Sequence, residues 1–230
     1  MTQPSIINVI FNFDRTLTTL EGPAELARRK KLPEIAALTE RAMEGEESFE
    51  DVFRKRFQLY RPTFRDLQWL GDQYVAHITP GARELISALD AEGHRSFIVS
   101  AGYRGAILKV AQVLGIPALN VCAVDIEFDG NGNFIAYDEG NILTTDRGVE
   151  TVLAEIARSG PSIYVGDSVR DVDGKTVVDL MIGYGGAKYR KAVEEGADVY
   201  LREASILPVL DHVHALQAKL PSKTRSIVHA

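Results

Sequence analysis

The sequence predicts an α/β protein with a Rossmann-like, doubly wound parallel sheet, an inserted α-helical cap and a β-hairpin. Short apolar runs alternate with amphipathic segments along most of the chain, which is typical of parallel strands joined by crossover helices. A purely helical tract interrupts this alternation after the first apolar run. Later, Asp129-Gly130-Asn131-Gly132 separates two further apolar runs, which is a strong hairpin signal.

The N-terminal part contains the first predicted strand and the predicted cap. The apolar run over residues 6–11 has the composition of a strand that is buried on both faces. The tract over residues 21–77 lacks strand signals, and two of its amphipathic segments have proline in the first turn, so helices are predicted over 23–31, 33–43, 49–59 and 63–78. The predicted cap domain is residues 18–78, and the predicted core domain is residues 1–17 and 79–230.

Strands and helices alternate through the rest of the predicted core. Helices are predicted over residues 80–92, 105–114 and 147–158. Strands are predicted over residues 95–99, 162–165, 180–182 and 199–201, and the hairpin occupies residues 124–137.

Composition excludes several classes of protein. The net charge of -6 argues against a nucleic-acid partner, because binding to phosphate backbones needs clustered basic surface. No apolar stretch approaches the roughly 20 residues that span a bilayer, and the N-terminus has no export signal, so a cytoplasmic protein without a membrane partner is expected. The single cysteine, Cys122, fits a reducing compartment, and its apolar surroundings predict a buried, inert thiol. A homodimer stays open.

Polar residues follow three of the predicted strands, at the edge where open α/β sheets bind ligands. Asn12-Phe13-Asp14-Arg15-Thr16 follows the first strand, and Ser100-Ala101-Gly102 follows the second. A hydroxyl and backbone N–H groups at such a turn form a cradle for phosphate oxygens. Gly166-Asp167-Ser168-Val169-Arg170-Asp171 follows the strand over 162–165, and its carboxylates are ligands that Mg²⁺ prefers.

These motifs resemble those of the haloacid dehalogenase superfamily of phosphatases, which begin with Asp-x-Asp-x-Thr and end with Gly-Asp-x-x-x-Asp. The resemblance implies that core fold, a Mg²⁺ cofactor, and hydrolysis of a phosphomonoester through an aspartyl-phosphate intermediate. Asn12 stands at the nucleophile position, where an amide has no anionic lone pair to attack phosphorus. The other implied roles are acid/base for Asp14, loop bracing by a hydrogen bond of Thr16, phosphate binding for Ser100, Ala101 and Gly102, metal binding for Asn12, Asp14 and Asp167, and an outer-shell position for Asp171.

The family also uses a cation, a lysine in most relatives, upstream of the last motif. Arg147 sits in the matching place, and a guanidinium fork can bridge phosphate and carboxylate. Lys175 is the alternative, and Arg147 is favoured. Close relatives carry Asn where this chain has Arg170, so the details of that loop stay open.

The predicted cap resembles that of the phosphoserine phosphatase family. The matching segments are Ala42-Met43-Glu44-Gly45, Phe49-Glu50 and Arg54-Lys55-Arg56. The resemblance implies that Arg56 holds the substrate carboxylate, that Glu21 meets the ammonium, and that Met43 and Phe49 close the pocket.

The predicted function is therefore Mg²⁺-dependent hydrolysis of a small phosphorylated metabolite, with phosphoserine as substrate and serine biosynthesis as the setting. The chain as written should be inactive or strongly impaired because Asn12 replaces the nucleophile. Two alternatives stay open: a phosphatase of another small phosphometabolite, and a natural protein that binds such a metabolite without hydrolysing it. Asn12 can equally be an introduced substitution that traps bound substrate.

Overall fold

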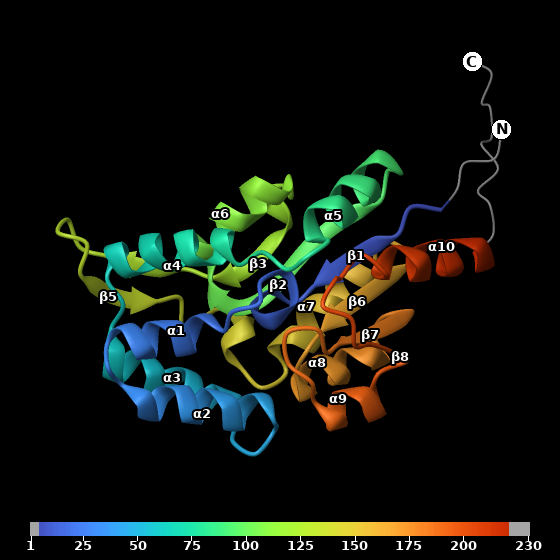
Figure 1. The fold of residues 1–230 in the computed structure, drawn as a ribbon. Helices are drawn as coiled ribbons and strands as arrows, with labels where there is room; N and C mark the ends of the chain where they lie inside the picture. Colours follow the sequence, from blue (N-terminus) through green and yellow to red (C-terminus); the bar gives the residue numbers. More distant parts are fainter. Residues whose placement is uncertain (1–4, 221–230) are drawn as a thin grey trace.

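The computed structural model describes residues 5–220 of the chain. Within these residues, six parallel strands form the central sheet in the order β3-β2-β1-β6-β7-β8 (Figure 1). The predicted doubly wound parallel sheet is therefore confirmed. The strands are β1 (Asn8–Phe11), β2 (Arg95–Tyr103), β3 (Val121–Val124), β6 (Ser162–Gly166), β7 (Leu180–Tyr184) and β8 (Val199–Leu201).

Helices cover both faces of this sheet. On the β2–β3 side of β1, the connections run through α5 (Ala82–Ala91) and α6 (Arg104–Leu114). On the β6–β8 side they run through α7 (Gly148–Ala157), α8 (Val169–Val172) and α9 (Lys191–Gly196). Because parallel crossovers are right-handed, helices on the two sides of β1 fall on opposite faces, as Figure 1 shows. The last helix, α10 (Val209–Lys219), packs against α5.

The helical insertion comprises α1 (Gly22–Arg29), α2 (Pro33–Met43), α3 (Phe49–Tyr60) and α4 (Phe64–Ala76). The segments that lead into and out of it lie side by side, because Thr18 and Ile78 form an antiparallel bridge. Ser48 caps α3 by accepting a hydrogen bond from the Asp51 backbone N–H at 3.3 Å. Helix α4 lies along α6 (Figure 1), so the insertion is attached to the core along a helix face as well as at its two connections.

The predicted hairpin is confirmed as an antiparallel pair, β4 (Ile126–Phe128) and β5 (Phe134–Tyr137). It packs against the insertion, where the Phe57 ring stacks on Phe134 with centroids 5.5 Å apart. The hairpin therefore covers one side of α3.

Apart from shifts of one or two residues at element ends, three sequence predictions differ from the structure. No strand was predicted where β3 (Val121–Val124) lies. The second strand was expected to end at Val99, but β2 continues to Tyr103, because Tyr103 is fully buried and pairs with Val124 after a shift in register. Cys122 is half-buried rather than buried, although burial still raises the pKa of its thiol. In the part of the chain that the structure describes, no helix is both long and apolar enough to cross a membrane.

Candidate active site

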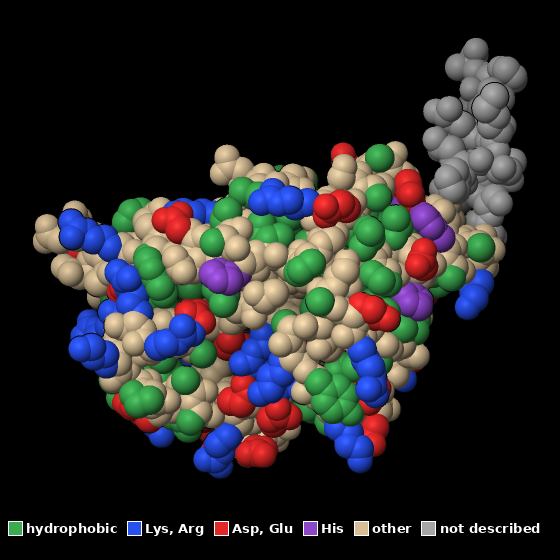
Figure 2. All heavy atoms as spheres, viewed as in Figure 1, with side chains coloured by type: hydrophobic (Ala, Val, Ile, Leu, Met, Phe, Trp, Pro, Cys, Tyr) green, Lys and Arg blue, Asp and Glu red, His purple; other side chains and the backbone are tan. Residues whose placement is uncertain are grey.

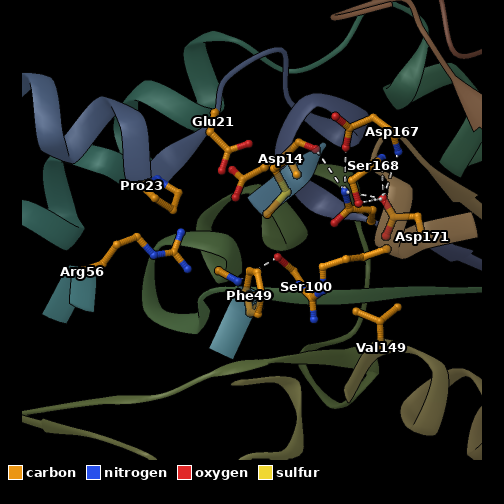
Figure 3. Close-up of a pocket in the computed structure, with 15 residues that line it drawn as sticks. Asp14, Glu21, Pro23, Phe49, Arg56, Ser100, Val149, Asp167, Ser168 and Asp171 are labelled. Carbon is orange, nitrogen blue, oxygen red and sulfur yellow. Dashed lines mark hydrogen bonds between the residues drawn. The ribbon is translucent and has the colours of Figure 1, made fainter. Parts of the chain in front are cut away.

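One pocket lies between the carboxyl ends of β1, β2 and β6 and the helices of the insertion. It gathers most of the predicted site residues from segments far apart in the sequence (Figure 3). Those from the sheet side are Asn12, Asp14, Ser100, Ala101, Gly102, Asp167 and Asp171, and those from the insertion and the segment before it are Glu21, Met43, Phe49 and Arg56.

Asn12 lies directly after β1 and faces the acidic residues that follow β6. Its Oδ1 accepts a hydrogen bond from the Phe13 backbone N–H at 2.7 Å. Its Nδ2 donates to Asp167 Oδ1 at 2.9 Å and to Asp171 Oδ2 at 3.4 Å. The amide therefore presents its donor, rather than its oxygen, to the carboxylate cluster.

Asp14 is buried beside the pocket, with its carboxyl group next to that of Glu21 (Figure 3). Burial, with the Glu21 charge as the next cause, raises the pKa of Asp14 to about 7. Tyr74 Oη and the Gly22 backbone N–H both donate to Asp14 Oδ1, at 2.8 and 3.0 Å, and they oppose the rise. A carboxyl group with this pKa can both donate and accept a proton near neutral pH.

Glu21 is the residue before α1 and is also buried. Burial raises the pKa of its carboxyl group, although the positive charges of Arg15 and Arg56 oppose this. The Arg15 Nε lies 3.8 Å from Glu21 Oε2. Glu21 therefore sits between two guanidinium groups at the wall of the pocket.

Ser100 and Gly102 form a narrow cradle within the last part of β2. Ser100 is 3% exposed, and its Oγ accepts a hydrogen bond from the Gly102 backbone N–H at 2.9 Å. A Cβ at position 102 would come within 3.0 Å of Ser100 Oγ and 3.5 Å of Asp14 Oδ2, so a side chain there would fill the cradle. Glycine thus leaves room beside Asp14 for a ligand group.

The loop after β6 is fixed by Asp171. Its Oδ2 accepts hydrogen bonds from the backbone N–H groups of Asp167 and Ser168, at 3.0 and 2.9 Å, and from Ser168 Oγ at 2.8 Å. Tyr164 Oη donates to the other carboxylate oxygen. Burial and the neighbouring Asp171 charge raise the pKa of Asp167, whereas Arg190 and Arg15 oppose the rise.

The oxygen atoms around Asn12 Nδ2 are spaced as the ligands of a Mg²⁺ ion would be. Asp167 Oδ1 and the Asp14 backbone oxygen lie 2.9 and 3.3 Å from that nitrogen, and neighbouring ligands of octahedral Mg²⁺ lie about 3 Å apart. Asn12 would supply an oxygen there only if its amide turned over and gave up the Phe13 hydrogen bond. Within residues 5–220, no group of three or more His, Cys, Asp or Glu side chains could hold a metal ion. Asp167 is the side-chain carboxylate among the oxygens named here, since the other is a backbone oxygen.

Arg56 approaches the pocket from α3, on the side opposite Asp167, Ser168 and Asp171 (Figure 3). It is 2% exposed, and its Nε has no hydrogen-bond partner. Its guanidinium lies 5.4 Å from the centroid of the Phe49 ring. No described residue forms an ion pair with Arg56, which lines the pocket and acts through its charge on Glu21.

Three sequence predictions do not agree with this geometry. Arg147 does not line the pocket: its side chain is 80% exposed, and both Nε and Nη2 donate to the Glu150 carboxylate at 3.0 Å. Lys175 is also elsewhere, paired with Asp198 at 2.8 Å. Thr16 is fully buried, but its hydroxyl has no hydrogen-bond partner, so the expected bracing bond is absent.

Three residues without a role predicted from the sequence also lie at the site. Arg170, which departs from the family pattern, lines the pocket. Tyr74 donates to Asp14 from 60 residues away, and the helical pattern around it gives no sign of this contact. Arg15 has a positive φ of 55° and reaches both Glu21 and Glu40.

Comparison with known proteins agrees with this arrangement. The model of the haloacid dehalogenase-like hydrolase family matches residues 9–174. Human phosphoserine phosphatase is 32% identical over 199 residues, which is 85% of this chain and 88% of the human protein. The chloroplastic phosphoserine phosphatase of Arabidopsis thaliana is 30% identical over 200 residues, which is 84% of this chain and 68% of that protein.

Solved structures share the fold over nearly the whole chain. A phosphoserine phosphohydrolase-like protein from Francisella tularensis has a TM-score of 0.79 and 26% identity, over 92% of this chain and 99% of that chain. A substrate-bound phosphoserine phosphatase complex has a TM-score of 0.80 at 24% identity, over the same shares of the two chains. Both the matched span and the identity to these relatives lead to one assignment: the chain belongs to the haloacid dehalogenase-like hydrolases, in their phosphoserine phosphatase-like family.

Proposed function

We propose that the pocket binds L-phosphoserine together with Mg²⁺, and that the chain hydrolyses this substrate poorly because Asn12 occupies the nucleophile position. The observation that carries the proposal is Arg56, a buried guanidinium without an ion pair among the described residues, whose charge acts on Glu21 and which lies across the pocket from Asp167. A carboxylate and an ammonium on one small substrate would match Arg56 and Glu21. The proposed setting is serine biosynthesis in the cytosol.

Each residue of the sheet side has a proposed role. Ser100 and the Gly102 cradle hold phosphoryl oxygens, and Asp14 gives a proton to the leaving oxygen and later takes one from water. A pKa of about 7 suits Asp14 to both steps. The missing part is an anionic oxygen at position 12, since the Asn12 amide is not a nucleophile.

Asn12, the Asp14 backbone oxygen and Asp167 are the proposed holders of Mg²⁺. The metal supplies positive charge against the phosphoryl oxygens when it is bound. The Asp171 hydrogen bonds to the loop backbone keep Asp167 in place for this role.

The alternative is a natural protein that binds a small phosphometabolite without hydrolysing it. One observation favours this reading: the Asn12 amide donates to both Asp167 and Asp171, so the acidic cluster is hydrogen-bonded without a metal. Retention of Asp14 with its raised pKa favours the catalytic reading, since a binding protein needs no acid/base.

Replacement of Asn12 by Asp tests the proposal. The variant gains an anionic nucleophile with almost no change in volume, so the barrier should fall by about 5 kcal/mol, several orders of magnitude in rate. Turnover should be measured with Mg²⁺ on L-phosphoserine and a panel of other small phosphomonoesters. Asp14→Asn in the same background is the matched control and should remove the gain. Turnover no higher than that of the unsubstituted chain would contradict the phosphatase assignment.

A further inference from the structure

We propose that Arg170, from helix α8, is the cation that holds the phosphoryl group of the substrate, in place of Arg147. This proposal rests on the proposed function and names a specificity-determining residue of that same pocket. The carrying observation is that Arg56 and Arg170 are the lysine or arginine residues that line the pocket within the described part of the chain. Each of two anionic groups on one substrate could therefore pair with its own guanidinium.

Arg170 is fixed in position without an ion pair, although the charges of Asp171 and Asp146 act on it. Its Nη2 donates to the Thr145 backbone oxygen at 3.0 Å, and its guanidinium carbon lies 3.4 Å from the centroid of the Phe49 ring. Its Nε is buried without a hydrogen-bond partner. No carboxylate of residues 5–220 forms an ion pair with it. A guanidinium held by a carbonyl and a ring keeps part of its donor fork available for an anionic ligand.

The position of Arg170 in the chain assigns it to the phosphoryl end of the pocket. It follows Asp167 by three residues and precedes Asp171, whose carboxylate is bonded to the loop backbone. Arg56 belongs to α3 and lies across the pocket from Asp167 and Asp171 (Figure 3), although its guanidinium and that of Arg170 both lie over the Phe49 ring. The phosphoryl group has to lie beside Asn12 and Asp167. Arg170 comes from the segment that carries Asp167, and its strongest charge partner is Asp171, so it is paired with the phosphoryl group and Arg56 of α3 with the carboxylate.

The geometry of α7 explains why Arg147 does not hold the phosphoryl group. Arg147 precedes the helix, and Glu150, three residues later, takes both of its donors in a bidentate pair. The residue that this helix turn directs to the pocket is Val149, which is apolar. The positive charge that the family draws from this turn therefore comes from α8 in this chain.

Calorimetric titration of the unsubstituted chain tests the assignment, because Asn12 allows ligands to bind without turnover. The ligands are inorganic phosphate, L-phosphoserine and L-serine. Arg170→Gln should weaken binding of phosphate and of L-phosphoserine by about tenfold to a hundredfold, the size of one charge-assisted contact, and should leave L-serine binding unchanged. Arg170→Lys keeps the charge without the fork and should recover part of the phosphate affinity.

Two further variants complete the set. Arg147→Gln tests the rival residue, and Arg158→Gln is a matched control, since Arg158 is an exposed arginine near the other end of α7 that pairs with Glu155. Both should bind all three ligands like the unsubstituted chain. Thermal unfolding of every variant checks that loss of the Phe49 contact has not unfolded the protein.

Several outcomes would overturn the proposal. Unchanged phosphate affinity in Arg170→Gln, or a loss confined to Arg147→Gln, would return the role to another residue. An equal loss for phosphate and L-serine would mean that Arg170 supports the pocket as a whole. A folded Arg170→Lys variant that binds phosphate no better than Arg170→Gln would also contradict it. If the unsubstituted chain binds neither phosphate nor L-phosphoserine, the proposed function fails and the role of Arg170 fails with it, whereas the preceding outcomes overturn the role of Arg170 alone.

Discussion

The Nδ2 atom of Asn12 is the neutral hydrogen-bond donor that faces the carboxylates of the pocket. Its Oδ1 is engaged by Phe13, so Nδ2 is the atom that faces Asp167 and Asp171. Replacement by Asp would add a third carboxylate beside those of Asp167 and Asp171. Burial already raises the pKa of Asp167. The demand for a compensating cation therefore increases in that variant.

Mg²⁺ should accordingly bind more weakly to the chain as written than to Asn12→Asp, but binding should not be lost. The amide has to break its hydrogen bond with Phe13 before it can offer an oxygen, and it brings no negative charge. Calorimetric titration of both forms with Mg²⁺ measures the difference. Equal affinities would mean that position 12 is not a metal ligand.

Arg56→Ala should impair L-phosphoserine more than an aryl phosphate without a carboxylate. The lost contact is charge-assisted and worth roughly 1.5–3 kcal/mol, so kcat/KM for L-phosphoserine should fall by about tenfold to a hundredfold. The comparison belongs in the Asn12→Asp background, where both substrates are turned over. An equal fall for both substrates would instead point to a role of Arg56 in packing with Phe49 and Phe53.

At the residue scale, the sequence predicted best the side chains that directly follow a buried strand. Asn12, Asp14 and Asp167 could be located because parallel strands end at one edge of the sheet. Arg147 could not, because the pairing of an exposed arginine depends on side-chain rotamers, and Glu150 is within reach on the same helix turn. The contact of Tyr74 with Asp14 also depends on tertiary packing that local pattern does not encode.

At the element scale, helix α2 is joined to the core by an ion-pair cluster around Glu40. Arg15 Nη2 donates to Glu40 Oε2 at 2.8 Å, and Lys188 and Arg190 both contact Oε1. The three hydrogen bonds hold the pKa of Glu40 well below its usual range, against the effect of burial. Figure 2 shows acidic and basic side chains gathered where α2 approaches the β7–α9 connection. Four residues from three parts of the chain thus join α2 to the core.

Glu40→Gln should loosen α2 from the core. The neutral side chain loses the charge attraction to Arg15, Lys188 and Arg190, so amide hydrogen exchange in α2 should become faster and L-phosphoserine should bind more weakly. Glu34→Gln is the matched control, because Glu34 is an exposed residue of the same helix without an ion pair among the described residues. If amide hydrogen exchange in α2 is the same in both variants as in the unsubstituted chain, the ion-pair cluster does not hold α2 against the core.

Some element bounds are set by local sequence signals, and others are set by tertiary contacts. Helix α2 and strand β8 have the predicted bounds, since proline and a short apolar run mark them locally. Strand β2 extends past its predicted end because Tyr103 pairs with Val124 at the end of β3, on the far side of the α6 connection. Alternation of strands and helices was enough for the fold class, but the length of β2 depended on a pairing partner.

At the scale of the whole molecule, His94 joins the beginning of the sheet to the last helix. The Ile7 backbone N–H donates to its Nδ1 at 3.2 Å, and Gln217 of α10 lies 3.5 Å from its Nε2. The His94 side chain is fully buried, and burial lowers the pKa of the imidazole, although Glu92 opposes this and His214 adds to it. The unfolded chain therefore binds a proton more readily than the folded chain does.

The His94 contribution to stability should be complete above its unfolded pKa of 6.5 and should be lost as the pH falls below that value. Urea unfolding from about pH 7 to about pH 5 measures it. His94→Gln should flatten this part of the stability profile, whereas His77→Gln, which alters an exposed imidazole, should not. A slope that survives in His94→Gln would assign the dependence to other groups.

Chemical trapping of the Asn12→Asp variant tests the central claim, that position 12 is where the phosphoryl group is transferred. The variant is mixed with L-phosphoserine and Mg²⁺, quenched in acid and treated with borohydride, which reduces an acyl phosphate to homoserine. Mass spectrometry of the peptides should then find homoserine at position 12 and unmodified Asp14, and the unsubstituted chain should give no such product. Turnover without modification of position 12, or modification of Asp14 instead, would contradict the account.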